Sequence, residues 1–271
     1  AELAAGPAVT ALGGLGAAAM AVADWRAIDG PGLAERATST ASGAAVGLAG
    51  LLAIVVWSAV LGGVYRSVAG DVGPSTGAVL SSLALGIATV SVAWGYLQGT
   101  GRGLEFVDVR RPDRRDAGYV VAGLAAAVGL NLGIEALFRA VGLASARHSL
   151  YDVARHDPGM LLVLIPLTIL LIGPGEELLY RNVVQKSLYD AFSRPGAVVV
   201  ASAIFAAAHV PAYSSAGATP LSVLNTLTIV FVLAVVLGVA YDRTRNVLVS
   251  ALIHGGFNAI AFAATYVELV G

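Results

Sequence analysis

Polar residues able to do chemistry gather in three hydrophobic stretches near the end of the chain. Glu176 and Glu177 lie in the first stretch, His209 in the second, and His254 in the third, where Asn258 follows one helical turn later. Charged groups are costly to place within a membrane, so they are functional candidates there. A free carboxylate beside imidazoles can act as a general base that activates water, and imidazole and amide groups can stabilise the oxyanion that forms. These residue types indicate hydrolysis of a carbonyl group.

The spacing of these residues indicates which of them share one face of a helix. Residues four apart share one face of a helix, so Glu177 and Arg181 are predicted to pair. Glu176 then points about 100° away and keeps a free carboxylate. His254 and Asn258 also share a face. The pair of Glu177 with Arg181 suits a structural ion pair equally well, and a lone intramembrane His or Asn is more often an interhelical hydrogen bonder than a catalyst.

The composition excludes several classes of protein. Of 271 residues, 57% are hydrophobic and 12% are charged, against roughly 25% charged in a soluble domain. The net charge of −1 argues against a general affinity for nucleic acid. The chain has no Cys, which excludes disulfides, thiol nucleophiles and thiolate metal sites. No Ser lies in a nucleophile-elbow sequence, so water is the more natural nucleophile.

The hydrophobic pattern predicts an all-α fold, a polytopic transmembrane bundle of about eight membrane helices, because each crossing needs about 20 apolar residues. The first segment is the weakest and equally suits a signal-like segment. In the fifth segment, Gly173-Pro174-Gly175 predicts a break facing protein or water. The predicted segments are 7–23, 42–64, 77–97, 118–138, 160–189, 195–212, 220–241 and 246–270.

Basic residues favour the cytoplasmic side of a membrane. If the charged loop 99–117 is a cytoplasmic anchor, the alternating helices place most basic residues on its side. We therefore expect a multi-pass protein of the cell membrane, with both termini outside and an active site accessible from the cytoplasmic side. The basic residues left outside are Arg66, Arg139, Arg147 and Arg155.

Three motifs resemble those of a known family. The segment 176–181 reads EExxxR, 205–209 reads FxxxH and 254–258 reads HxxxN. Together they resemble the CPBP family of intramembrane glutamic endopeptidases, which includes the CAAX-processing Rce1 proteases. The resemblance runs from about 160 to 261. Asn182 and Ala234 depart from the family by standing where Gly is usual or common, which puts close packing in doubt.

The resemblance implies roles for the motif residues. Glu176 would activate water, and His209, His254 and Asn258 would complete the site. Glu177 and Arg181 would orient Glu176 or contact a substrate terminus, with Phe205 and Phe257 as pocket lining. The chain 1–271 is expected to be a single integral membrane domain, with helices lacking catalytic motifs in 1–138 and a catalytic core in 160–261. The expected partners are a peptide or membrane-protein substrate and the lipid bilayer, without nucleic acid or a cofactor. The substrate and the oligomeric state stay open.

Two alternatives remain beside a glutamic endopeptidase. The first is a zinc-dependent protease that uses His209, His254 and one Glu, although the HExxH signature is missing. The second is a non-catalytic scaffold or immunity-type member of the family. In the loop before the fifth segment, His148 and His156 lie near acidic residues. They are expected to be solvated, and a weak metal site is the less favoured interpretation.

Overall fold

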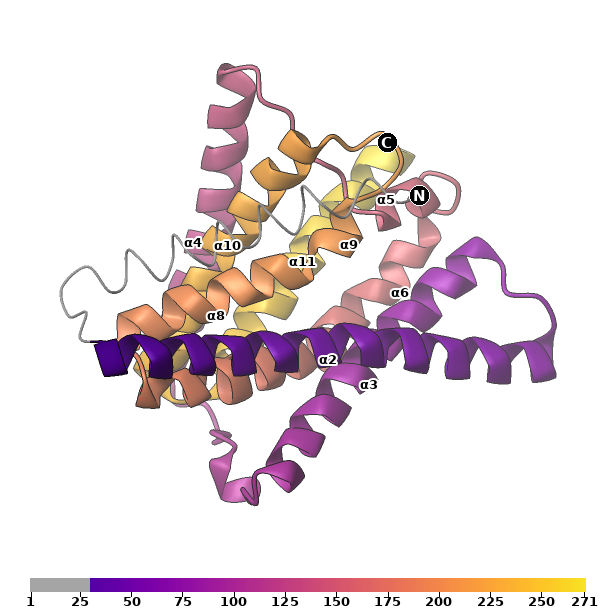
Figure 1. Cartoon of the computed structure of the whole chain (residues 1–271). Coiled ribbons are helices and arrows are strands. Elements are labelled where there is room, and N and C mark those ends of the chain that lie inside the picture. Colours follow the sequence, from indigo (N-terminus) through magenta and orange to yellow (C-terminus); the bar gives the residue numbers. More distant parts are fainter. Residues whose placement is uncertain (1–29) are drawn as a thin grey trace.

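The computed structural model describes residues 30–271 of the chain, and this part contains helices and no strand. Four segments connect or extend the long helices: η1 (Leu104–Phe106), α5 (Leu150–Ala154), η4 (Leu188–Asp190) and α9 (Val210–Tyr213). The long elements in Figure 1 are α2 (Gly30–Ala69), α3 (Pro74–Gly99), α4 (Arg114–Ala140), a composite helix from Gly159 to Gln185, α8 (Arg194–Ala208), α10 (Pro220–Thr244) and α11 (Val247–Val270).

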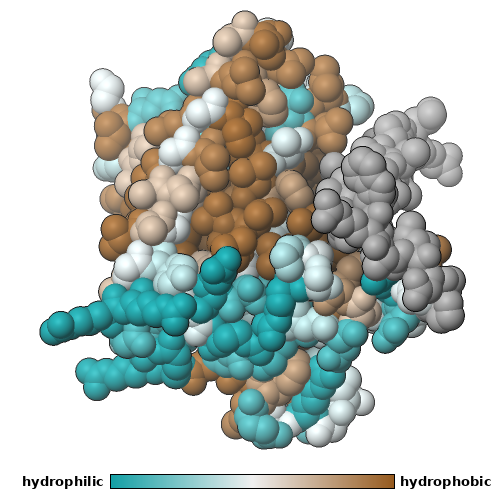
Figure 2. Space-filling view, turned by 90° about the vertical axis from the view of Figure 1, so that its left-hand side faces the viewer, coloured by the Kyte–Doolittle hydropathy of each residue, from teal (hydrophilic) through white to brown (hydrophobic). Residues whose placement is uncertain are grey.

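The helices fit a membrane. Within 30–271, six are long and apolar enough to cross a bilayer, and α8 is a shorter apolar helix. Figure 2 shows a hydrophobic surface above an end where hydrophilic side chains gather. The protein is therefore a multi-pass helical bundle. The predicted segments from 42–64 onward each correspond to one of these helices, whereas the segment 7–23 lies outside the described residues.

The predicted break at Gly173-Pro174-Gly175 is wrong. The composite helix runs on through α6 (Gly159–Leu167) and α7 (Gly173–Glu177), and its backbone widens into π-helical turns at η2 (Thr168–Ile172) and η3 (Leu178–Gln185). Pro174 has no backbone N–H to donate, and the π-turns beside it let the helix continue without that hydrogen bond. The two acidic residues thus stay on a continuous helix.

Two glycines let α11 approach the composite helix. A Cβ atom on Gly255 would lie 2.8 Å from the carbonyl oxygen of Thr168 and from the Cα of Ile169. A Cβ atom on Gly173 would lie 3.0 Å from the carbonyl oxygen of Ala251. Only glycine fits such backbone contacts. The close approach brings the carboxylates at the end of α7 beside the middle of α11.

One end of the bundle, here called the basic end, is closed by the loop 100–113. Asp108 binds the Lys186 ammonium at 2.7 Å and accepts a hydrogen bond from the Tyr241 hydroxyl at 2.6 Å. Its backbone amide donates to the side chain of Asn182 at 2.7 Å. The loop is therefore a structured cap on η3 and α10, which goes beyond the membrane anchor expected from its charge. Asn182 serves this cap, and its departure from the family pattern does not loosen the packing.

The opposite end, here called the mouth end, holds the loop 141–149. The Asn225 amide donates to the carbonyl of Ala144 at 2.8 Å, and the amide of Ala146 donates to the Thr226 hydroxyl at 2.8 Å. Both partners lie on α10. The C-terminal end of α11 lies at this end too, where the Tyr151 hydroxyl donates to Glu268 at 3.2 Å.

Candidate active site

A cavity of about 770 Å³ occupies the middle of the bundle and extends to the mouth end. It is lined by side chains from α2, α3, the composite helix, α8, α10 and α11. The four residues predicted to be catalytic and the two predicted to line the pocket all contribute to its wall: Glu176, His209, His254, Asn258, Phe205 and Phe257. The structure thus brings together residues that lie up to three helices apart in the chain.

The two neighbouring carboxylates have different surroundings. Glu177 is fully buried and accepts a hydrogen bond from the Nε of Arg181 at 3.0 Å, so the predicted ion pair is confirmed. Its other oxygen lies 3.1 Å from the Nδ1 of His254. Both oxygens of Glu177 are therefore committed to protein partners.

Arg181 is held inside the protein. It is 0% exposed and does not line the cavity, and its guanidinium lies over the Phe205 ring, 5.0 Å from the centroid. Only its Nε pairs with Glu177; Nη1 and Nη2 have no hydrogen-bond partner in the described chain but are buried, so neighbouring side chains would have to move before this cation could meet a substrate terminus. The geometry favours the supporting role over the substrate contact.

Glu176 has no such partner. Among residues 30–271 no protein group donates a hydrogen bond to its carboxylate, and the nearest imidazole nitrogen, Nε2 of His254, lies 3.7 Å away. This separation exceeds a hydrogen bond and leaves the carboxylate to the cavity. Nδ1 of His254 carries the hydrogen shared with Glu177, and the other ring nitrogen, Nε2, is the one near Glu176.

His209 ends α8 and is fixed in a similar way. Its Nδ1 lies 2.8 Å from the carbonyl oxygen of Phe205, which can only accept, so Nδ1 carries the hydrogen. The neutral ring then presents Nε2 as an acceptor. Phe205 packs between the two imidazoles, with ring centroids 4.4 Å from His209 and 5.7 Å from His254.

Asn258 lies one turn beyond His254 on α11 and contributes an amide to the cavity wall. No hydrogen bond joins that amide to another group in the described part of the chain. An amide with free donors beside an unpaired carboxylate can bind a polar substrate atom. The cavity therefore combines a base, acceptors and a donor within an apolar wall.

The residues do not form a ready metal site. Within 30–271, no three His, Cys, Asp or Glu side chains are close enough to hold a metal ion. His148 and His156 do not form the weak site considered from sequence, because His148 lines the cavity and His156 turns to the carbonyl of Asp152. A catalytic zinc would need the ligand side chains of the central cavity to move together.

The position of the cavity bears on the expected sidedness. The cavity reaches the mouth end through Arg147, Tyr151 and Glu268, and no residue of the loop 100–113 or of the α10–α11 turn lines it. The basic loops and the mouth therefore lie at opposite ends of the bundle. The side of the membrane from which the active site is reached stays a prediction, and it depends on which of these two ends is cytoplasmic.

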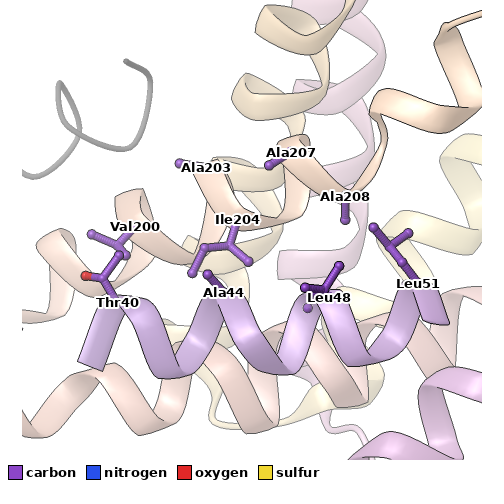
Figure 3. A pocket seen from close by; sticks show the side chains of 10 residues that line it. Thr40, Ala44, Leu48, Leu51, Val200, Ala203, Ile204, Ala207 and Ala208 are labelled. Carbon is purple, nitrogen blue, oxygen red and sulfur yellow. The ribbon is translucent and has the colours of Figure 1, made fainter. Parts of the chain in front are cut away.

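A smaller cavity of about 350 Å³ lies between α2 and α8. Figure 3 shows side chains of α2, from Thr40 to Leu51, facing those of α8. Leu51 and Ala208 line both this cavity and the central one. Apart from Thr40 its lining side chains are apolar, so this cavity adds no group able to do chemistry.

Sequence reasoning missed some of the cavity wall. Tyr180, Tyr213 and His148 line it beside the predicted residues. Tyr180 lies inside the first motif, where its place four residues after Glu176 was a usable signal. His148 and Tyr213 come from connections between helices, and only the fold brings them to the site.

Comparison with known proteins agrees with the motifs. Residues 158–260 match the family model of type II CAAX prenyl endopeptidase Rce1-like proteins. No curated protein and no solved structure matches the chain. The predicted resemblance is confirmed over residues 158–260, which are similar to the Rce1-like family. This similarity supports an intramembrane protease of the CAAX type.

Proposed function

We propose that the protein is an intramembrane endopeptidase in which Glu176 activates water to hydrolyse a peptide bond. The observation that carries the proposal is the division of labour between adjacent carboxylates. Glu177 is occupied by Arg181 and His254, whereas Glu176 lines the cavity without a hydrogen-bonding partner in the described chain. A base must be free to take a proton, and Glu176 is the carboxylate that is free.

The proposed reaction begins with a water held by the carboxylate of Glu176 and by Nε2 of His209. Glu176 takes one proton while the water oxygen bonds to the carbonyl carbon of the substrate. The Asn258 amide and the His254 ring stabilise the oxyanion that forms. His254 takes part as the imidazolium, protonated on both nitrogens before the water attacks: Nδ1 donates to Glu177 and Nε2 to the oxyanion, and neither proton is transferred. Collapse of the intermediate breaks the C–N bond, and Glu176 returns its proton to the leaving amine.

The proposed substrate is a peptide or a segment of a membrane protein. Most of the cavity wall is apolar, and the cavity lies among helices that cross the bilayer. An apolar wall favours a chain already partitioned into the membrane. Prenylation of the substrate is not needed for the chemistry.

The test compares purified protein with its Glu176→Gln variant on quenched-fluorescence peptides of mixed apolar sequence. The amide cannot accept the water proton, so the rate of cleavage should fall by the roughly hundredfold to ten-thousandfold expected for a lost general base. Glu135→Gln is the matched control, because Glu135 lies on α4, outside the cavity wall. Full activity in Glu176→Gln, or no cleavage by the wild type, contradicts the proposal. The second outcome would favour a non-catalytic scaffold.

One observation favours a second candidate, a zinc-dependent protease. His209 and His254 both donate from Nδ1 to a fixed oxygen, which leaves both Nε2 atoms for other partners. Imidazoles that bind metals commonly have this arrangement. The separation of the side chains stands against it, since they form no ready group of three ligands in 30–271.

A further inference from the structure

The loop before α5 holds His148 in a fixed place. On one side of it, the amide of Ala146 donates to the hydroxyl of Thr226 at 2.8 Å and to the carbonyl of Ser222 at 3.1 Å. On the other side, the amide of Ser149 donates to the carbonyl of Ala212 at 2.8 Å. The loop is thus bound to α10 and α9 on both sides of His148. A histidine in such a loop has a defined position, unlike a solvated one.

The ring of His148 is fixed too. Its Nδ1 accepts a hydrogen bond from the amide of Leu150 at 3.1 Å, and the ring meets Tyr213 edge to face, with centroids 5.2 Å apart. Because Nδ1 accepts, the neutral ring carries its hydrogen on Nε2. Burial lowers the pKa of His148 to about 4, and repulsion from His209 acts in the same direction. The ring therefore stays a neutral Nε2–H donor at neutral pH.

This donor belongs to the central cavity. His148 lines it together with Glu176 and His209, and its neighbours Arg147 and Tyr151 continue the wall toward the mouth. His148 thus lies on the mouth side of His209. In the described chain no acceptor forms a hydrogen bond with its Nε2. A peptide in the cavity offers a carbonyl oxygen at every residue, which is the acceptor that a neutral N–H donor fits.

We propose that His148 is a substrate-binding residue, whose Nε2–H donates to a backbone carbonyl of the peptide on the mouth side of the scissile bond. This inference rests on the proposed function. The contact is made by the bound substrate before and during the reaction, so it stabilises both states equally. Uniform binding of this kind lowers KM and leaves kcat unchanged.

The test uses three variants in the full-length protein in detergent. In His148→Leu the donor is lost, and KM for the cleaved quenched-fluorescence peptides should rise roughly tenfold at constant kcat, as expected for one hydrogen bond. His148→Gln keeps an amide donor and should recover most of this loss. His156→Leu is the control, because His156 is exposed and outside the cavity wall. Thermal unfolding of each variant checks that the fold is kept.

A binding measurement gives a readout without catalysis. In the Glu176→Gln background, adding His148→Leu should weaken binding of the same fluorescent peptides by a similar factor, measured by fluorescence anisotropy. An unchanged KM and unchanged binding in folded His148→Leu protein overturn the role of His148. A fall in kcat alone overturns it as well. Full cleavage by Glu176→Gln would instead contradict the proposed function, so the two failures are distinct.

Discussion

Glu177 holds the ring of His254, whose Nδ1 donates to its carboxylate at 3.1 Å. The two residues are far apart in the chain and meet where glycines let α7 and α11 come close. A carboxylate that orients an imidazole and favours its charged form is a recurrent device in hydrolases. Here the second of the two adjacent glutamates, Glu177, orients the imidazole, and the first, Glu176, is left free to act as the base.

The first prediction concerns the buried ion pair. Glu177→Gln leaves the Arg181 guanidinium, which is 0% exposed, without its counter-charge. Loss of one partner of a buried pair typically costs about 3–5 kcal/mol of unfolding free energy. We expect a loss of that size by chemical unfolding in detergent, together with partial rather than complete loss of cleavage.

The control for this prediction replaces both partners. A double variant, Glu177→Leu with Arg181→Met, removes both charges and should recover much of the stability. It should not recover activity, because His254 loses its acceptor. If Glu177→Gln is as stable as the wild type, the pair is not a structural element of the site. Complete inactivity of Glu177→Gln with full activity of Glu176→Gln would reverse the roles assigned to the glutamates.

The sequence was a good guide where the information is local. The pairing of Glu177 with Arg181 follows from helical spacing, and the hydrophobic lengths locate the membrane helices from 42–64 onward. The continuity of the helix through Pro174 was missed, because the outcome depends on π-turns that the surrounding packing selects. A lone proline predicts a defect without specifying its form.

The parts that sequence reasoning missed depend on long-range contacts. Asp108 lies in a charged loop, and nothing near it in sequence indicates its bonds to Lys186 and Tyr241. His148 is similar, since its place in the cavity depends on hydrogen bonds between its loop and α10. Loops acquire such roles only when distant helices fix them.

The second prediction uses neighbouring glycines on α11. Gly255→Ala places a Cβ atom 2.8 Å from backbone atoms of Thr168 and Ile169, so the helices must separate. We expect a loss of about 1–3 kcal/mol in unfolding free energy, and a loss of cleavage as His254 moves from Glu176. Thermal unfolding and peptide cleavage measure the two effects.

The neighbouring position provides the control. At Gly256 the nearest atoms to a new Cβ belong to the Leu124 side chain, 3.6 Å away, which is an ordinary contact. Alanine is also favoured over glycine inside a helix by about 1 kcal/mol. Gly256→Ala should therefore be neutral or stabilising and keep its activity. Equal effects of the two substitutions would mean that the approach of α7 and α11 does not set the site.

The third prediction concerns orientation, and the absence of Cys makes it simple to test. Single-Cys variants at Arg111, in the loop of the basic end, and at the exposed Val141, at the mouth end, can be labelled with a membrane-impermeant maleimide on intact cells. The excess of basic residues predicts that Arg111→Cys is protected, as a cytoplasmic group, and that Val141→Cys reacts. The cavity would then open to the outside. The reverse pattern would place the mouth in the cytoplasm and contradict the rule for this chain.

The last prediction separates the two hydrolytic mechanisms. If Glu176 activates water directly, purified protein should cleave its peptides without added metal, and a strong chelator should leave the rate unchanged. Loss of the Asn258 amide in Asn258→Ala removes one donor to the oxyanion and should lower kcat by the roughly hundredfold to thousandfold typical of such a loss. No other described group is bonded to that amide, so the substitution breaks no other hydrogen bond. Zinc chemistry predicts that the chelator abolishes cleavage in folded protein and that stoichiometric zinc restores it. His209→Ala would then release the metal, whereas in the glutamic mechanism it only lowers the rate by removing one of the two groups that hold the water. One tightly bound zinc per active chain, lost in His209→Ala, would favour the second mechanism over the first.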